Sequence, residues 1–255
     1  SSTGVKTDKF NNLITNKITK SKNIKLQLQA LNFKLDLREL SLFIETQDPK
    51  INYINQEIPA KNIKIYLDFI PLLKTDLKIK KINIIFNELN ISQLNELSKF
   101  IKPSNLKSFL NNKIKEAKLI SEIELFLNKN GELKNYIFKG KVLDLKADLL
   151  NDLILSKTNL SFFADKEDIL IKNIFGNLDG IEINNGDIKL NLENGVKLNS
   201  NFISNINLDG SKIKKLNSYL EKLNFLVNIK ELNGNFNNNN FINFDKTYKV
   251  IDYDY

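Results

Sequence analysis

Residues 179–210 read DGIEINNGDIKLNLENGVKLNSNFISNINLDG, and this stretch decides the fold class. Its isoleucine, leucine and phenylalanine residues alternate with asparagine, lysine and glutamate, which is the two-residue period of a half-buried β-strand. The pairs Asn185-Gly186, Asn194-Gly195 and Asp209-Gly210 interrupt the alternation, and such pairs favour the positive φ angles of tight hairpin turns. The stretch therefore predicts antiparallel strands joined by hairpins.

The same alternation extends in both directions along the chain. It begins near Ile24, and Asn130-Gly131 is predicted to turn a long hairpin between strands around residues 119–127 and 136–142. The apolar phase slips by one residue at Leu31 and again at Val142, which predicts a bulge or a tight turn at each place. Because strands and helices do not follow one another in β-α-β order, the sheet is predicted to be antiparallel.

Helical spacing of apolar residues replaces the strand pattern in a few short segments. Thr7 or Asp8 is predicted to cap the first helix and Ser92 the second, and Pro103-Ser104 is predicted to open the next one. The predicted organisation is a single unit over residues 1–255. It consists of an amphipathic helix (1–22), a first β section (23–90), a helical pair (91–112), a second β section (113–210), a helix (211–223) and further strands (224–255) that continue beyond the end of the chain.

The predicted sheet has more apolar surface than the predicted helices can cover. About fourteen strands would make a sheet roughly 67 Å wide, and open sheets of more than about ten strands tend to curl. Its apolar face would measure on the order of 1,200 Å², whereas about 45 helical residues shield only roughly 680 Å². The predicted fold class is therefore mainly β with a few short helices, in which a long curled antiparallel sheet forms a U-shaped β-groove. A sandwich in which the sheet packs against itself is the alternative.

The apolar ladder along these strands is the candidate binding feature of the sequence. It is either an ordinary core or the lining of a groove that holds an apolar ligand. The candidate groove-lining residues are Leu26, Leu28, Leu35, Ile123, Leu125, Leu127, Phe138, Val142, Phe162, Ile171, Ile183, Ile188, Leu190, Leu198 and Phe202.

Composition excludes most catalytic chemistry. The 255 residues include no His, Cys, Met or Trp, so the chain has no thiol nucleophile, no imidazole base, no disulfide and none of the usual zinc or haem ligands. It also contains no G-x-S-x-G, P-loop, G-x-G-x-x-G or EF-hand string. We therefore expect that the protein is not an enzyme and that it has no catalytic residues, no metal site and no cofactor.

Carboxylates cluster in three places, and paired carboxylates can perform acid-base catalysis or hold calcium. Each cluster falls on a polar strand face or in a turn, so we interpret all three as solvated surface. The clusters are Asp144 with Asp148, then Asp165 with Glu167 and Asp168, and finally Asp179 with Glu182 and Asp187.

The net charge of +8 is concentrated in the first half of the chain, since residues 1–120 carry a net +10 and residues 121–255 a net −2. Such an excess raises the question of a polyanion or an anionic membrane as partner. Arg38 is the only arginine, and arginine is the usual bidentate partner of phosphate and guanine, so we expect no nucleic-acid partner. The basic half is interpreted as lysine-rich solvated surface. Its alternatives are a docking face for anionic lipid headgroups and sequence-independent polyanion binding.

Several stretches resemble AsmA-like proteins, the TamB and AsmA group of bacterial envelope proteins. Residues 2–14 resemble the segment that directly follows the N-terminal membrane anchor of that family, and other stretches look like its repeating β units. The stretches are STGVKTDKFNNLI (2–14), LKIKKINI (77–84), IKPS (101–104), FKGKV (138–142) and INNGDI (183–188).

This resemblance implies a role in the envelope of a Gram-negative bacterium. It implies an inner-membrane anchor upstream of Ser1, an elongated β-groove in the periplasm, and transport of phospholipid between the inner and outer membranes along the apolar interior. The alternative is a structural or adaptor module in outer-membrane biogenesis or protein assembly, with an outer-membrane protein partner and without lipid conduction. The chain opens at Ser1 without Met and has no run of about 18 apolar residues, so we expect that it was cut from a longer protein and that the anchor lies outside it.

Overall fold

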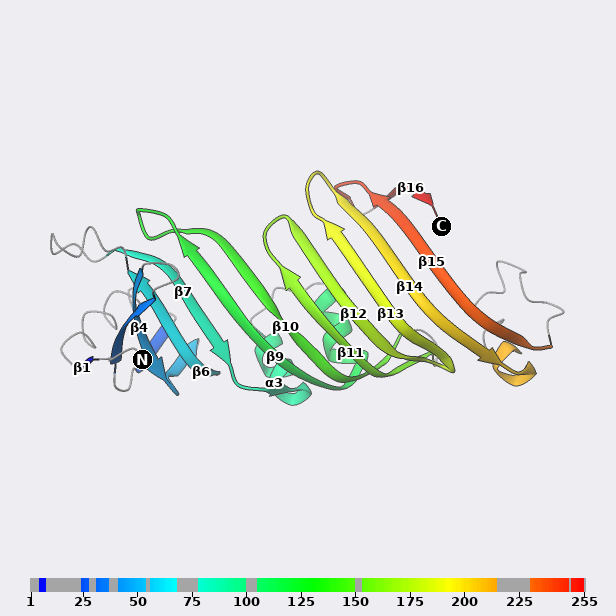
Figure 1. Cartoon of the computed structure of the whole chain (residues 1–255), viewed down its shortest axis with the longest axis horizontal. Helices are drawn as coiled ribbons and strands as arrows, with labels where there is room; N and C mark the ends of the chain where they lie inside the picture. The colour runs from blue at the N-terminus through cyan, green and yellow to red at the C-terminus, as the bar shows by residue number, and fades with distance from the viewer. Residues whose placement is uncertain are drawn as a thin grey trace. The chain divides into compact units, whose positions relative to one another are not determined.

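The computed structural model describes residues 5–7, 24–27, 31–36, 41–53, 56–67, 78–99, 105–149, 153–214, 230–247 and 249–254 (Figure 1). The chain divides into two compact units, one made of residues 1–89 and 120–139 and the other of residues 90–119 and 140–255. The long strands β9 (Ile114–Leu127) and β10 (Leu133–Asp148) contribute to both units. The fold is mainly antiparallel β with short helices, which confirms the predicted fold class.

The first unit contains a sheet in which the strand order is β1-β3-β4-β6-β7-β9. Strand β5 pairs with both β2 and β6. Every one of these pairs is antiparallel. The strands are β1 (Val5–Thr7), β2 (Ile24–Gln27), β3 (Leu31–Asp36), β4 (Ser41–Gln47), β5 (Lys50–Tyr53), β6 (Gln56–Leu67) and β7 (Ile79–Phe86).

The apolar face of this unit is a closed core. Strand β6 pairs with β5 through residues 56–59 and with β4 through residues 62–67, so one long strand belongs to two pairings. This arrangement brings Ile51 of β5 into the same buried cluster as Ile44, Ile65 and Leu67. The last three side chains are each 1% exposed. Here the alternating pattern fills a core and leaves no apolar surface at these positions.

The opposite face of β4 holds a buried carboxylate with several partners. Glu45 accepts a hydrogen bond from Lys34 through Oε2 and one from Asn62 through Oε1 at 2.8 Å, and Lys64 Nζ lies 3.9 Å from the same Oε1. Burial acts to raise the pKa of Glu45, but the hydrogen bonds from Lys34 and Asn62 and the two lysine charges outweigh burial, so this pKa is below its ordinary value. Glu45 is therefore ionised in the folded protein at neutral pH.

The second unit is a meander in which each strand pairs antiparallel with the next. Beyond β10 its strands are β11 (Ile154–Ala164), β12 (Asp168–Leu178), β13 (Ile181–Asn191), β14 (Val196–Leu208), β15 (Leu232–Phe244) and β16 (Val250–Asp254). Two helices, α3 (Ile91–Ser98) and α4 (Asn105–Asn112), precede them in the chain, and the short strand β8 (Leu89–Asn90) leads into α3.

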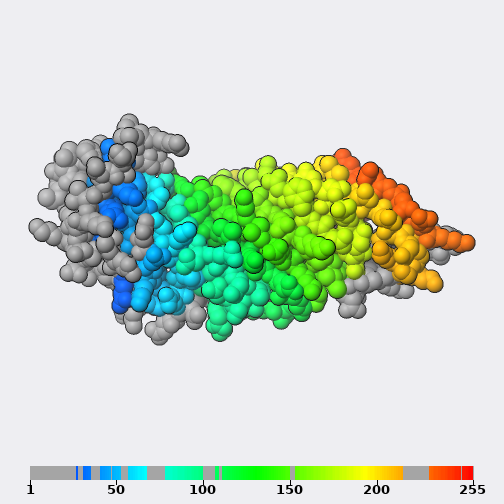
Figure 2. Space-filling model, turned by 60° about the horizontal axis from the view of Figure 1, so that its bottom comes forward, coloured from blue at the N-terminus to red at the C-terminus, as the bar shows by residue number. Residues whose placement is uncertain are grey.

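The helices of this unit lie where the sequence predicts a helical pair, within residues 91–112. Asn90, and not the predicted Ser92, is the N-cap of α3, because its side chain accepts the Gln93 N–H at 3.0 Å while the Gln93 side chain accepts the Asn90 N–H. Ser98 Oγ donates to Asn111 Oδ1 at 2.9 Å and so links α3 to α4. On the face shown in Figure 2 the helical residues lie beside residues of β9 and β10.

Three neighbouring strands of the second unit carry a residue with left-handed backbone geometry. These are Asp144 in β10, Lys157 in β11 and Asn173 in β12, with φ angles of 53°, 48° and 54°, and we call them the bulge line. The next strand satisfies the backbone at two of them, since the Asn159 side chain accepts the Asp144 N–H at 3.1 Å and the Asp187 side chain accepts the Asn173 N–H at 3.0 Å. Asp144 lies two residues after Val142, where the sequence predicts an irregularity.

One predicted hairpin turn is wrong, and its glycine explains why. Asn185-Gly186 lies inside β13, whereas the turn between β12 and β13 is made by Asp179-Gly180, with φ angles of 52° and 97°. Gly186 pairs with Phe202, and a Cβ on Gly186 would lie 2.4 Å from a ring carbon of Phe202. The glycine is needed there for the close approach of this ring, not for a turn.

Of the other predicted turns, two are hairpin turns and one is not. Asn194-Gly195 joins β13 to β14, with φ angles of 57° and 120°, and Asn130-Gly131 lies in the β9–β10 hairpin, so both predictions are confirmed. Asp209 instead begins a helical turn, because its carboxylate accepts the N–H groups of Ser211 and Lys212.

Some predicted segments lie wholly or partly outside the described residues. Val5–Thr7 form β1, so they are not part of the helix predicted over 1–22, and residues 8–22 are not described. Residues 210–214 are helical within the predicted helix 211–223, and residues 215–223 are not described. Residues 28–30, which precede the phase slip predicted at Leu31, also lie outside. Strands β15 and β16 occupy the predicted C-terminal β section.

Candidate apolar binding face

Most of the candidate groove residues have half-buried side chains. Leu35 is 50% exposed, Leu26 lies in β2 but its side chain is not described, and Leu28 lies outside the described residues. The half-buried candidates are Ile123, Leu125, Leu127, Phe138, Val142, Phe162, Ile171, Ile183, Ile188, Leu190, Leu198 and Phe202.

The candidates of the first unit lie next to its closed core. Ile123 of β9 is the cross-strand partner of Ile84 in β7, and Leu125 is the partner of Ile82. Ile82 and Ile84 are partly buried and pack against the core of that unit. These two positions are therefore accounted for by ordinary packing.

The strand register of the second unit places five of the other candidates in two rows. Ile183 and Phe202 lie outside these rows, because Ile183 pairs with Ser204 and Phe202 with Gly186. Direct cross-strand partners share a face of the sheet, with Cβ atoms about 5 Å apart. One row crosses six strands without a polar residue, and we call it the apolar row. Its members, from β11 to β16, are Ala164, Ile169, Leu190, Leu198, Ile242 and Tyr253.

A second row of cross-strand partners lies two residues away from the apolar row along each strand, and its side chains change from apolar to polar at β14. Phe162, Ile171 and Ile188 are successive partners, but the row continues through Ser200 and Asn240. The Asn240 side chain donates to Ser200 Oγ at 3.4 Å. The alternation does not predict this polar pair, because Ser200 and Asn240 occupy strand positions at which it predicts apolar side chains.

The side chains of the apolar row are less buried than those of the closed core in the first unit. Its members in β11 to β15 are half-buried, and Tyr253 in β16 is 64% exposed. By contrast, Ile44 and Ile65 in the first unit are each 1% exposed. The row also contains Ile169, Ile242 and Tyr253, which the sequence analysis did not single out. The alternation marks them as apolar strand positions, but only the register shows that they align with Leu190 and Leu198.

The face of the sheet opposite the apolar residues carries ion pairs. Lys139 Nζ lies 2.8 Å from Glu122 and 3.2 Å from Glu124. The hydrogen bond to Glu122 raises the pKa of Lys139 above its ordinary value against the opposing effect of burial, and Glu124 adds to the increase. Lys118 pairs with Asp144 at 3.6 Å. This face carries charged side chains, so the two faces differ in the ligands they can hold.

The predicted carboxylate clusters have local structural partners. Asp148 pairs with Lys115 at 3.4 Å. Asp165 accepts the N–H groups of Asp168 and Glu167, and these backbone hydrogen bonds hold the pKa of Asp165 below its ordinary value. Among the residues that the structure describes, no three Asp or Glu side chains gather where they could hold a metal ion.

In the described parts of the chain, no helix has the length and apolar character needed to cross a membrane. Comparisons with family models, with curated proteins and with solved structures find no match to this chain.

Proposed function

We propose that the protein is a non-enzymatic lipid carrier that holds acyl chains against the apolar row of its second unit. The observation that carries the proposal is that this row is continuous over six strands and only half-buried, whereas the equivalent residues of the first unit form a closed core. In the role that the AsmA-like resemblance suggests, the cargo is phospholipid that moves between the inner and outer membranes of a bacterial envelope. No catalytic residue is required.

The dimensions of the apolar row suit an acyl chain. Six strands spaced about 4.8 Å apart span roughly 24 Å, and one leaflet of a bilayer, which is half of a core about 30 Å thick, is about 15 Å deep. A single extended chain therefore fits along the row and crosses the strands. Each methylene removed from water stabilises the bound state by about 0.8 kcal/mol, and this gain does not depend on a particular residue.

The test exploits the alternation of faces along a single strand. A photocrosslinking amino acid replaces Leu190 or Leu198, which lie in the apolar row, or Lys189 or Asn199, which directly neighbour them in sequence and lie on the opposite face. Each variant of the full chain is irradiated with vesicles that contain a labelled phospholipid. We expect labelling at Leu190 and Leu198 and little at Lys189 and Asn199. Equal labelling on both faces, or none at either, would contradict the proposal.

A second candidate is a structural or adaptor module in outer-membrane biogenesis, and the observation that favours it is strand β16. Among the described strands β16 pairs only with β15, and its residues Val250, Ile251 and Tyr253 are 46%, 63% and 64% exposed. An exposed edge of this kind can add a strand from a partner protein. If this is the function, proline at Ile251 abolishes partner capture while the phospholipid labelling at Leu190 stays unchanged.

A further inference from the structure

A second recognition feature lies on the polar face of the same sheet. The register makes Lys189, Asn199, Phe241 and Asp254 successive cross-strand partners from β13 to β16, with Leu170 of β12 opposite Lys189. A hollow of about 490 Å³ lies over these residues, within the range of small-molecule sites, which is about 300–1,000 Å³. The side chains of these residues alternate with the apolar row along each strand, so they lie on the other face of the sheet. Four residues of the second row also line the hollow, namely Ile171, Ile188, Ser200 and Asn240.

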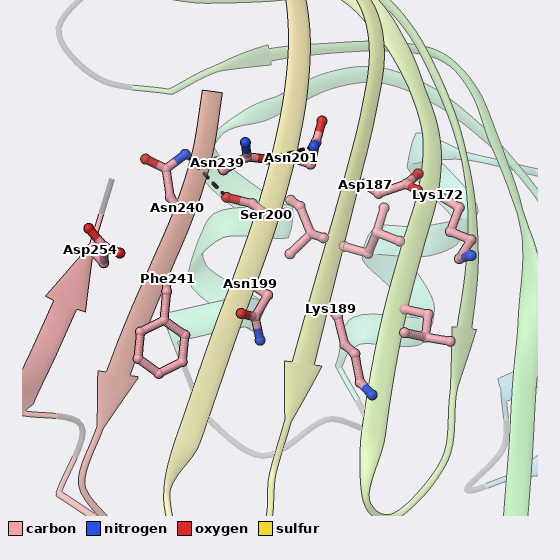
Figure 3. Close-up of a pocket in the computed structure, with 13 residues that line it drawn as sticks. Lys172, Asp187, Lys189, Asn199, Ser200, Asn201, Asn239, Asn240, Phe241 and Asp254 are labelled. Atoms are coloured by element: carbon pink, nitrogen blue, oxygen red, sulfur yellow. Dashed lines mark hydrogen bonds between the residues drawn. The ribbon is translucent and has the colours of Figure 1, made fainter. Parts of the chain in front are cut away.

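A parallel set of side chains completes the lining. Asp187, Asn201 and Asn239 are also successive partners, two residues away along the strands, or about 7 Å. Lys172 lines the hollow beside them. Figure 3 shows the labelled side chains on neighbouring strands, with Lys172 close to Asp187 and with the ring of Phe241 near Asn199.

The hydrogen-bonding capacity of the hollow is only partly used within the chain. Asn201 Nδ2 donates to Asn239 Oδ1 at 2.6 Å, which leaves the carbonyl oxygen of Asn201 and the amino group of Asn239 for other partners. Asp187 uses one carboxylate oxygen to accept the Asn173 N–H. The Asn199 amide makes no hydrogen bond to another described residue. The hollow therefore offers both donors and acceptors at neighbouring positions.

The charges of the lining cancel, since it contains two lysines and two aspartates. This balance favours neither a phosphate nor a metal cation. Vicinal hydroxyl groups are both donors and acceptors, so they match the amides and carboxylates of the hollow. Leu170 and Phe241 add apolar surface suited to the C–H face of a sugar ring.

We propose that this hollow binds a neutral saccharide, through the amides of Asn199, Asn201 and Asn239 and the ring of Phe241. The proposal does not rest on lipid binding, because its residues lie on the other face of the sheet. A shallow and exposed site of this kind should bind weakly, with a Kd of about 1 mM.

The probes are maltotriose and triacetylchitotriose, added separately to the full chain and observed by saturation-transfer difference NMR and by protein amide shifts. We expect saturation transfer to at least one trisaccharide and shifts confined to residues of β12 to β16. Replacing Asn199 and Asn201 together with leucine should weaken binding by about tenfold or more, which is the effect of losing about 1.4 kcal/mol. Phe241→Ala should reduce saturation transfer to the C–H protons of the sugar.

The matched control is Asn205→Leu, which changes the same residue type on the same face of β14 at a residue that does not line the hollow. Thermal unfolding of each variant shows whether it is folded. Three results would overturn the proposal: no transfer to either sugar, transfer that the Asn199 and Asn201 replacements leave unchanged, or shifts produced by inorganic phosphate and not by the sugars. None of them bears on phospholipid labelling at Leu190, so the two proposals fail separately.

Discussion

Lys157 is the residue at which local backbone geometry and residue type disagree. Its φ of 48° is left-handed, and a non-glycine residue in this region costs about 1–2 kcal/mol unless it is Asn or Asp. Its neighbours in the bulge line, Asp144 and Asn173, are of the tolerated types. The strain at Lys157 is therefore available for removal by mutation.

We expect Lys157→Gly to raise the free energy of unfolding by about 1 kcal/mol, because glycine adopts this φ without strain. Urea denaturation followed by circular dichroism measures the change. The control is Lys189→Gly, which removes the same side chain from a regular position of β13 and should lower stability by about 0.5–1 kcal/mol. A loss of stability in Lys157→Gly would contradict the assignment of strain.

Gly186 presents the reverse case, since its small size is required by a neighbour. We expect Gly186→Ala to lower the free energy of unfolding by about 1–3 kcal/mol, because the new Cβ would overlap the Phe202 ring. The double variant Gly186→Ala/Phe202→Leu should be less unstable than the sum of the two single variants. Additive losses in this double-mutant cycle would show that the ring is not the cause.

At the scale of the element, β4 carries the core residue Ile44 on one face and the ionised Glu45 on the other. The folded pKa of Glu45 is lowered, so near and below its ordinary pKa of about 4.5 the unfolded chain binds more protons than the folded chain. The stabilisation from Glu45 is thus fully present well above that value and is lost as the pH falls through the folded pKa.

We expect the free energy of unfolding to fall below about pH 4.5 and to fall less steeply in Glu45→Gln. Urea denaturation at a series of pH values tests this, and NMR titration of the Glu45 carboxyl carbon measures its pKa directly. The comparison variant is Glu57→Gln, which changes an exposed glutamate of β6 for which no ion pair occurs among the described residues. A pKa for Glu45 above its ordinary value would reverse the sign and refute the account.

The elements also show which features the sequence could predict. Strand existence, antiparallel pairing and the helical pair follow from periodicity, because burial on one face of a strand or helix leaves its period in the sequence. Asn185-Gly186 and Asp179-Gly180 are both plausible turns by composition. What distinguishes them is the contact of Gly186 with Phe202, sixteen residues away, and no local pattern contains that information.

The candidate site shows the same limit. The alternation identifies Leu190 and Leu198 as apolar face residues, but it does not align them with Ile242 and Tyr253, because alignment depends on the register of β14 to β16. It also does not distinguish the closed core around Ile44 from the half-buried apolar row. Both have the same period, and they differ only in what packs against them.

At the scale of the whole molecule, β16 is the described strand at which we expect another chain to associate, because among the described strands it pairs only with β15. Its apolar residues Val250, Ile251 and Tyr253 favour edge-to-edge pairing, while Asp252 and Asp254 place negative charges on the same strand. Two copies that approached through this strand would bring these carboxylates together, so we expect the charges to oppose self-association.

We expect the double variant Asp252→Thr/Asp254→Thr to self-associate at concentrations at which the parent chain does not, because threonine removes the repulsion and favours β structure. Sedimentation velocity measures the distribution of species. Glu57→Thr with Glu182→Thr makes the same charge change at exposed positions of the internal strands β6 and β13 and should leave the distribution unchanged. If both variants behave alike, net charge and not the edge is responsible.

The bulge line also bears on how the gene tolerates the loss of single codons. Lys157 lies where β11 has one residue more than β12, and Asn173 lies where β12 has one residue more than β11, as the two register shifts between these strands show. Deleting either codon restores plain alternation and leaves every remaining side chain facing the way it did before. Deleting the codon for Ser161 or Leu170 instead turns part of the strand over, so that lysines point where leucines had been. In a library of such deletions, survivors within β11 and β12 should concentrate at these two positions.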